Sequence, residues 1–511
     1  MRNTSYRNQL FVLLILTLFC SPTFGQKLAL SSVFTDHMVL QRDKVLPVWG
    51  KSGPDEQIIV TFAGQKKTTR STSDGNWMVK LEPLSGSKVG RDLVVLGNSK
   101  VVISDVVVGE VWICSGQSNM QFAASAVTEI RGLTPFSENV RSFEVKRTVS
   151  LTEKDAVSGQ WEIANPSSAV AFSFAYFLQN SLDVPVGIIH SSWGSSSIEA
   201  WMPKDMTEKL PHFKTIMAEF DADTATQNRI HRILKTPNGW TGQDDIFLRR
   251  QPNVLYNAMM KPLAPFACQG IVWYQGERNT RYLSGMPQVN QENWYERVAG
   301  MKEYGDVLSQ WIVRYRQEWH DDEMNLLVVM LPGYGKGTMK KPDIDPESPT
   351  EESWAWMRES QLKVLDVPHT AVANTIDLGD LTNIHPKDKL PIGQRLALLA
   401  AKSAIGSDRL TTGPILKNIE IRGGELIVKF ENATGLKTLD HKAPTAFWIA
   451  DNSGQWKPAV AKLIGENVIL SSPEIAKPLY VRYAFSGKPK VNLVNSLELP
   501  AYPFRTDDFE Q

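Results

Sequence analysis

The middle of the chain alternates apolar, strand-like runs with segments of helical period. The apolar runs lie at 110–115, 184–190, 270–274, 326–331 and 371–376. Helical patterns occur between and after them, at 172–182, 308–319, 354–365 and 391–405. Strands that are apolar throughout and separated by helices are typical of a parallel sheet with helices on both faces. The pattern therefore predicts a three-layer α/β/α core with a five-stranded parallel sheet.

The two ends of the chain have a different pattern, without a helical period. Short runs rich in β-branched and aromatic residues alternate with Gly, Asp, Ser and Pro, which predicts strands and turns. These runs lie at 45–49, 57–62, 77–81, 425–430, 467–470 and 479–483. We therefore predict an N-terminal β domain at 26–105, an α/β domain at 106–408 and a C-terminal β domain at 409–511, both β domains being sandwich-like.

The first 25 residues resemble a secretory signal peptide. Arg2 and Arg7 precede a ten-residue apolar run, and small residues before Gln26 match a signal-peptidase site. The alternative is a lipid anchor at Cys20, but the bulky Leu and Phe before it disfavour lipidation. The run is shorter than the roughly 20 residues that span a bilayer. We expect residues 1–25 to be removed and the mature protein to be exported, periplasmic or extracellular, without stable membrane insertion.

Charge and cysteine content exclude several classes of protein. The 511 residues include 55 basic and 55 acidic ones, and this balance argues against a nucleic-acid-binding surface. After removal of the signal only Cys114 and Cys268 remain, which is too few for a disulfide framework or a zinc cluster. We expect both cysteines to be buried apolar residues, and no metal site.

Polar residues follow the predicted strands at the edge where ligands of parallel sheets bind. Ser118 follows the first strand and opens a helix pattern, and Gly194 follows the second. A serine there is either a helix cap or a nucleophile near N–H groups that favour negative charge. A glycine there is either part of a turn or a backbone donor to an oxyanion.

The third and fifth strands are followed by further candidates. Gln275, Glu277 and Asn279 form a dense polar cluster after the third strand, and His385 follows the fifth. Imidazole, with a pKa of about 6.5, exchanges protons around neutrality. A serine nucleophile needs such a base, and its oxyanion needs fixed donors. His190 is the competing histidine, and a plain solvated loop is the alternative for the polar cluster.

Several ordered motifs resemble the sialate O-acetylesterases, a family of the SGNH hydrolase superfamily. The motifs are GEVWICSGQSNM at 109–120, LYNAM at 255–259, WYQGE at 273–277, RESQ at 358–361, and DLGD, HP and GQRL between 377 and 396. The resemblance covers nearly the whole chain, both β regions included. It implies a core that hydrolyses O-acetyl esters of sialic acid or related sugars without a cofactor.

The resemblance also implies roles for individual residues. Ser118 is the expected nucleophile and His385 the base, with Gly194 and the segment from Gln275 to Asn279 at the oxyanion. Many relatives carry Asp three residues before the histidine, where this chain has Thr382. The group that orients His385 is therefore Glu277, which we favour, or Asp380, or a backbone carbonyl. Arg278 stands where relatives usually carry serine. We expect this difference to alter the pocket and so the preference for the acetylated sugar.

Two other functions remain open from the sequence. One is deacetylation of xylan or another plant polysaccharide, and the other is a non-catalytic carbohydrate-binding surface protein. Tryptophans suit a sugar-binding cleft because aromatic faces stack on pyranose rings. The candidates near the predicted site are Trp193, Trp201, Trp273 and Trp356.

Overall fold

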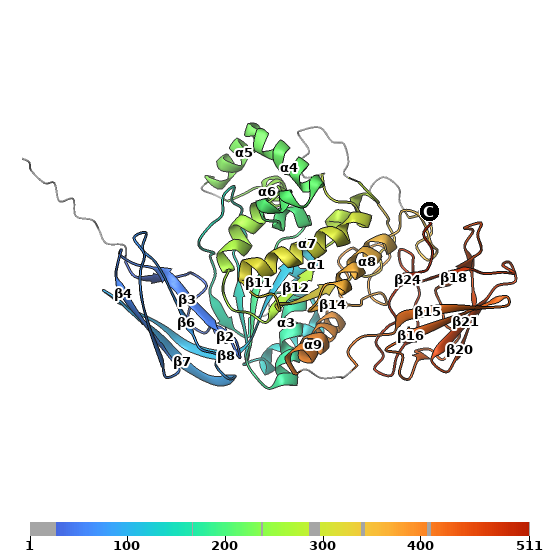
Figure 1. Cartoon of the computed structure of the whole chain (residues 1–511), viewed down its shortest axis with the longest axis horizontal. Coiled ribbons are helices and arrows are strands. Elements are labelled where there is room, and N and C mark those ends of the chain that lie inside the picture. The colour runs from blue at the N-terminus through green and yellow to red at the C-terminus, as the bar shows by residue number, and fades with distance from the viewer. Residues whose placement is uncertain are drawn as a thin grey trace, which may run out of the picture.

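The computed structural model describes residues 27–165, 167–236, 239–285, 297–338, 343–405 and 410–509. The predicted signal peptide at 1–25 and the predicted boundary between 408 and 409 lie outside these residues. A central α/β body stands between two β-rich ends of the molecule (Figure 1). None of the described helices is both long and apolar enough to cross a membrane.

The central body is built on a sheet with strand order β10-β9-β11-β8-β12-β13-β14. The bounds are β8 Lys100–Gly116, β9 Val140–Glu144, β10 Trp161–Ile163, β11 Val186–Ser192, β12 Gly270–Tyr274, β13 Asn325–Val329 and β14 Thr370–Ala373. All five predicted strands are present and pair in parallel. The count of five is wrong, because β9 adds a sixth parallel strand and β10 an antiparallel one. Arg141 and Ser142 interrupt the apolar pattern of β9, although both are buried.

Helices cover both faces of this sheet, as predicted. They are α3 Ala169–Leu182, α7 Met301–Trp319, α8 Ala355–Leu362 and α9 Leu390–Ile405. On one face Trp112 of β8 packs edge-on against Phe174 of α3, with ring centroids 5.4 Å apart. On the other face Trp273 of β12 packs against Trp311 of α7 at 4.6 Å. The structure also contains α1 Ser118–Gln121, α2 Thr128–Arg131, α4 Pro211–Ala222, α5 Thr224–Leu234 and α6 Gly242–Leu248. Of these, α4, α5 and α6 lie above the sheet in Figure 1.

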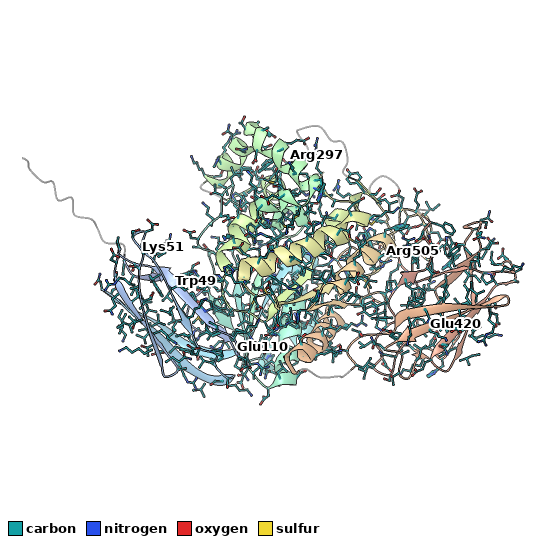
Figure 2. The ribbon with its side chains drawn as sticks, viewed as in Figure 1. Trp49, Lys51, Glu110, Arg297, Glu420 and Arg505 are labelled. Atoms are coloured by element: carbon teal, nitrogen blue, oxygen red, sulfur yellow. The ribbon has the colours of Figure 1, made fainter. Side chains whose placement is uncertain are left out.

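The N-terminal β region shares a strand with the central sheet. Its strands are β1 Ala29–Leu30, β2 Val39–Gln41, β3 Leu46–Lys51, β4 Gln57–Phe62, β5 Gln65–Arg70, β6 Asn76–Leu81 and β7 Ser87–Leu96. The first half of β8 pairs with β2 and β7, and its second half pairs with β11 and β12. The predicted boundary at 105/106 therefore falls inside one continuous strand. An Arg42–Glu110 ion pair of 2.5 Å reinforces this junction, where Glu110 is labelled in Figure 2.

The C-terminal region contains two four-stranded antiparallel sheets and a two-stranded one. The strand orders are β15-β16-β21-β20, β19-β18-β22-β24 and β17-β23. The bounds are β15 Ile415–Arg422, β16 Glu425–Glu431, β17 Lys437–Thr438, β18 Phe447–Ala450, β19 Lys457–Pro458, β20 Val460–Ile464, β21 Asn467–Ser471, β22 Tyr480–Tyr483, β23 Leu493–Val494 and β24 Phe504–Arg505.

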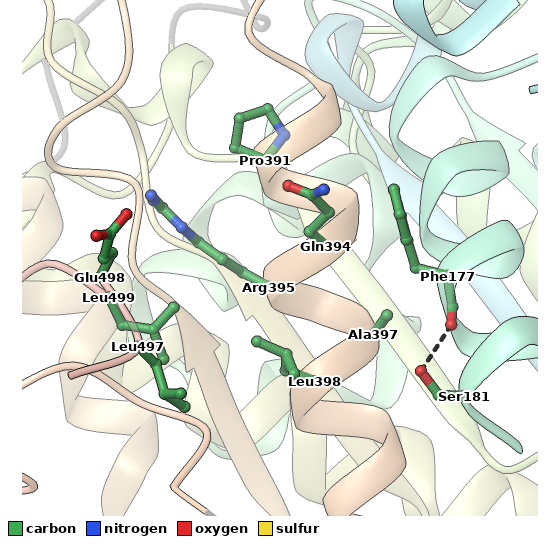
Figure 3. A pocket seen from close by; sticks show the side chains of 10 residues that line it. All are labelled: Phe177, Ser181, Pro391, Gln394, Arg395, Ala397, Leu398, Leu497, Glu498 and Leu499. Atoms are coloured by element: carbon green, nitrogen blue, oxygen red, sulfur yellow. Dashed lines mark hydrogen bonds between the residues drawn. The ribbon is translucent and has the colours of Figure 1, made fainter. Parts of the chain in front are cut away.

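Two features join this region to the core. Arg505 of β24, labelled in Figure 2, forms a 2.7 Å ion pair with Glu359 of α8. A cleft of about 380 Å³ lies where α3 and α9 meet the loop at 497–499, and it is lined by Gln394 and Arg395 on α9 (Figure 3). The C-terminal region therefore contacts α8 on one face of the core and lines a cleft with α3 and α9 on the other.

Candidate active site

Ser118 is presented at the carboxyl edge of the sheet by a sharp turn after β8. Gly116 ends the strand with φ of 137°, and a methyl group there would lie 2.1 Å from the carbonyl oxygen of Tyr274. Only glycine accommodates both this φ and this close approach. The Gln117 N–H donates to the same carbonyl at 3.0 Å. α1 then begins at Ser118, so its hydroxyl stands at the first turn of a short helix.

His385 lies in the loop between β14 and α9, and its ring reaches Ser118. Its Nε2 is 2.8 Å from Ser118 Oγ, although 267 positions separate the two residues. Within the loop, Asp380 Oδ1 accepts N–H bonds from Thr382 at 2.8 Å and Asn383 at 2.7 Å. Asn383 Oδ1 in turn accepts the His385 N–H at 2.9 Å. The expected convergence of the serine and the histidine is therefore present.

The surroundings of His385 favour its neutral form. The ring is half-buried, and burial lowers its pKa below the usual value, with a smaller lowering from the nearby Lys389 ammonium. A neutral imidazole has a free lone pair that accepts a proton, as a general base must. The electrostatics therefore fit a base that acts near neutral pH.

Neither carboxylate expected to orient His385 is hydrogen-bonded to it. Glu277 Oε1 accepts a hydrogen bond from the Asn119 side-chain amide at 2.5 Å. Asp380 Oδ1 accepts the backbone N–H of Thr382 in its own loop. Among the described residues no hydrogen bond or ion pair links His385 Nδ1 to a carboxylate. The expectation of a direct contact with Glu277, or with Asp380 instead, is therefore not met. Burial raises the pKa of Glu277 to about 7.

Gly194 lies directly beside Ser118, two residues after β11 ends. A methyl group at position 194 would lie 3.0 Å from Ser118 Cβ. The Gly194 N–H donates to Gln121 Oε1 at 2.7 Å. Because a side-chain carboxamide can rotate away, this N–H is a suitable donor for an oxyanion formed on Ser118.

Gln275 and Asn279 are not placed to donate to an oxyanion, contrary to expectation. Both are fully buried. The Gln275 amide donates to Gln117 Oε1, to the Ser196 carbonyl and to Asn279 Oδ1. The Asn279 amide donates to Glu199 and to the Ala299 carbonyl. These side chains brace the segment after β11, and their donors already have partners inside the protein.

The other aromatic and histidine candidates are also structural. Trp193, Trp201, Trp273 and Trp356 are at most 2% exposed, so none is a sugar platform. Trp240, which the sequence analysis missed, is partly exposed and stacks on Trp193 at 5.7 Å.

His190, the competitor of His385, is held by Ser167 at Nδ1 and by Ser192 at Nε2. Burial, with a smaller contribution from Arg147, lowers its pKa to about 4. Cys114 and Cys268 are free and buried, as predicted. Among the described residues no group of three or more His, Cys, Asp or Glu has the geometry of a metal site.

Three residues near the dyad were missed, namely Asn119, Gln121 and Lys389. Asn119 and Gln121 belong to the motif at 109–120, and their proximity to Ser118 was a usable signal. No sequence pattern indicated Lys389, because it lies in a stretch predicted to be a loop, where a lysine is expected to be exposed. In the structure its side chain is fully buried. Its ammonium donates to Asn119 Oδ1 at 2.6 Å.

A serine hydroxyl bonded to a histidine, at the carboxyl edge of a helix-covered parallel sheet, is typical of α/β ester hydrolases. The chain belongs to the carbohydrate esterase family of sialic acid-specific acetylesterases, whose model matches residues 108–402. It is therefore a carboxylic ester hydrolase of a family that acts on acetylated carbohydrates.

Relatives match almost the whole chain. Sialate O-acetylesterase of Mus musculus is 27% identical, over 96% of this chain and 97% of its own. The Homo sapiens enzyme of the same name is 26% identical, over 96% and 95%. The crystal structure of a carbohydrate acetylesterase from Xanthomonas citri is 31% identical, with a TM-score of 0.78, covering 94% of this chain and all of that one.

Proposed function

We propose that this protein is an exported esterase that removes O-acetyl groups from sialic acid, with Ser118 as nucleophile and His385 as general base. The 2.8 Å contact between Ser118 Oγ and His385 Nε2 is the observation that carries the proposal. Membership of an acetylesterase family supports an acetyl ester as the bond that is cleaved. The names of the mammalian relatives support sialic acid as the sugar.

The proposed reaction begins when His385 takes the Ser118 proton. The serine oxygen attacks the acetyl carbonyl, and the tetrahedral oxyanion accepts the N–H of Ser118 and that of Gly194, displacing Gln121 from the latter. The sugar hydroxyl leaves with the proton from His385 Nε2. Water then gives a proton to His385 and attacks the acetyl-enzyme, which releases acetate and restores Ser118.

Sialic acid differs from most sugars by its carboxylate, and basic groups lie at this edge of the sheet. Arg147 follows β9 and is exposed, and it lies close enough to His190 to influence its pKa. Arg250 donates to Ser195 Oγ at 2.7 Å, one residue from Gly194. These cations favour an anionic sugar over a neutral one, because opposite charges attract across a partly desolvated site.

Replacing the nucleophile tests the mechanism. Ser118→Ala is expected to lower kcat on an aryl acetate by about 10⁴-fold or more, because no other hydroxyl occupies its place. Ser125→Ala, an exposed serine seven residues further on, is the matched control and is expected to keep full activity. Wild-type protein is also expected to form a fluorophosphonate adduct at Ser118. Substantial turnover by Ser118→Ala would refute the assignment, and absence of the adduct would favour a non-catalytic carbohydrate-binding protein.

A comparison of substrates tests the sugar. We expect faster acetate release from O-acetylated sialic acid than from acetylated xylan. Arg147→Ala is expected to raise KM for the sialate substrate by about tenfold, the effect of losing roughly 1.4 kcal/mol of binding, and to leave KM for a neutral aryl acetate unchanged. Lys146→Ala, an exposed neighbour, is the control. Preference for xylan, with no effect of Arg147→Ala, would instead identify a polysaccharide deacetylase, which the Xanthomonas relative's description as a carbohydrate acetylesterase also accommodates.

A further inference from the structure

The side chain of Asn119, next to the nucleophile, is hydrogen-bonded at both ends of its carboxamide. Its Nδ2 donates to Glu277 Oε1 at 2.5 Å and to the Ile384 carbonyl at 3.0 Å. Its Oδ1 accepts from Lys389 Nζ at 2.6 Å. All three side chains are at most 6% exposed. One amide therefore connects the residue after Ser118 with the residue before His385.

The chemistry of the partners fixes which way this amide points. A lysine ammonium is only a donor, whereas a carboxylate and a backbone carbonyl are only acceptors. The oxygen of Asn119 must therefore face Lys389, and its NH₂ group must face Glu277 and Ile384. If the lysine donor is removed, the preference for this orientation weakens, and the bond that holds the Ile384 carbonyl weakens with it.

The groups that meet here come from three segments of the active-site edge. Asn119 lies in α1 with the nucleophile, Glu277 follows β12, and Lys389 belongs to the same loop as His385. We propose that Lys389 is a positioning residue which, through Asn119 and with Glu277 as anchor, holds the His385 loop against Ser118. This inference rests on the proposed function, since it concerns the same serine and histidine.

The arrangement explains how His385 is held without a carboxylate on Nδ1. In a Ser-His-Asp triad the acid fixes the ring orientation by a direct hydrogen bond. Here Asn119 holds the backbone immediately before the histidine, and the Asn383 side chain holds its N–H. The loop backbone is thus fixed on both sides of the peptide that leads into His385.

Lys389 also has an electrostatic effect that a purely structural residue lacks. After burial, its ammonium is the other group that lowers the pKa of His385. The charged groups that face Lys389 are Glu277 from the β12 side and Asp388 from its own loop, and its ammonium also lies over the rings of Phe122 and Tyr274. Burial lowers the pKa of Lys389 to about 8, so most molecules carry the ammonium at pH 7.

Replacing Lys389 by an apolar residue of similar length removes both its hydrogen bond to Asn119 and its charge near His385. Lys389→Met is expected to lower kcat by about 10²-fold, the usual cost of a displaced catalytic group. It is also expected to move the acid limb of the kcat/KM profile to higher pH, because losing a nearby positive charge makes the imidazole easier to protonate. The pH dependence of fluorophosphonate labelling of Ser118 should show the same displacement without involving sugar binding.

Two further variants complete the experiment. Asn119→Leu breaks the bridge but keeps the lysine charge, so it should lower the labelling rate with little change in the pH midpoint. Lys387→Met, an exposed lysine in the same loop, should behave as wild type.

The labelling results distinguish the inference from the proposed function. If wild-type protein is labelled at Ser118, and both Lys389→Met and Asn119→Leu have the wild-type labelling rate and pH midpoint, the inference is wrong while the proposed function stands. If Lys389→Met does not fold, Asn119→Leu alone decides: a wild-type labelling rate overturns the inference, and a reduced rate at an unchanged midpoint supports it. Absence of labelling in wild type would overturn both.

Discussion

At the scale of single residues, the space around Ser118 leaves little tolerance for added atoms. Gly194 faces it without a side chain, and a methyl group there would meet Ser118 Cβ at 3.0 Å and Gln121 Oε1 at 3.2 Å. Both contacts are tighter than ordinary van der Waals packing, so the serine must shift by a few tenths of an ångström. Such a shift matters for the proposed mechanism, in which the attack on the acetyl carbonyl and the proton transfer to His385 depend on the same position of the serine oxygen.

We therefore expect Gly194→Ala to lower kcat on an aryl acetate by about 10–10²-fold, with little loss of stability. Gly242→Ala is the matched control, because a methyl group there meets nothing within 4 Å. Measurements of kcat and of the thermal unfolding midpoint for both variants check this. Wild-type turnover in Gly194→Ala would show that the Gly194 amide does not adjoin the reacting atoms.

Also at the residue scale, sequence reasoning located Ser118 and His385 but misjudged the amides around them. The end of a parallel strand fixes the edge of the sheet at which the next segment starts, which was enough to place Ser118, two residues after β8, and the long loop after β14 that carries His385. Whether Gln275 points into the site or into the protein depends on partners such as Gln117 and Ser196, which are 158 and 79 positions away. No local pattern encodes such partners, and the same holds for Glu277 and Asn119.

At the scale of elements, strands and helices with a strong apolar period were predictable, and those without it were not. The runs at 270–274 and 391–405 became β12 and α9 almost unchanged. β9 was missed because Arg141 is buried by donating to the His37 carbonyl, an exception to the rule that charged positions face water. The predicted domain boundary falls inside β8, because the polar Ser104 and Asp105 interrupt the apolar pattern there without ending the strand.

At the scale of the whole molecule, the C-terminal region supports the loop that carries His385. Lys488 belongs to that region, and burial, together with the nearby Arg358 guanidinium, lowers its pKa below the usual value. Three carboxylates of the His385 loop, those of Asp377, Asp388 and Asp380, act in the opposite direction and raise it. The segment at 333–335 lies between the C-terminal region and the His385 loop. The Tyr334 N–H donates to the Gly487 carbonyl, and the Gly335 N–H donates to the Leu381 carbonyl. A β region that is not part of the central sheet thus contacts the segments that position His385.

Arg358 of α8 is the residue on which this support is best tested. It is fully buried, and its guanidinium donates to the carbonyl oxygens of Ser486 and Gly487 in the C-terminal region and of Pro332 before the 333–335 segment. Arg358→Met leaves these buried carbonyls without a charged donor, which is expected to lower the free energy of unfolding by about 2–4 kcal/mol. Gly487 accepts the Tyr334 N–H, and the neighbouring Gly335 N–H donates to the Leu381 carbonyl of the His385 loop, so kcat is expected to fall as well.

Chemical denaturation and steady-state kinetics measure the two effects of Arg358→Met, and Arg422→Met provides the comparison. Arg422 ends β15 in the same C-terminal region but is exposed, so its replacement should change stability by less than about 0.5 kcal/mol. A loss of stability without a loss of kcat would mean that the C-terminal region is merely attached to the core. A loss of both, with the pH midpoint of kcat/KM unchanged, would show that it positions the base mechanically, in contrast to Lys389, whose charge acts on the imidazole itself.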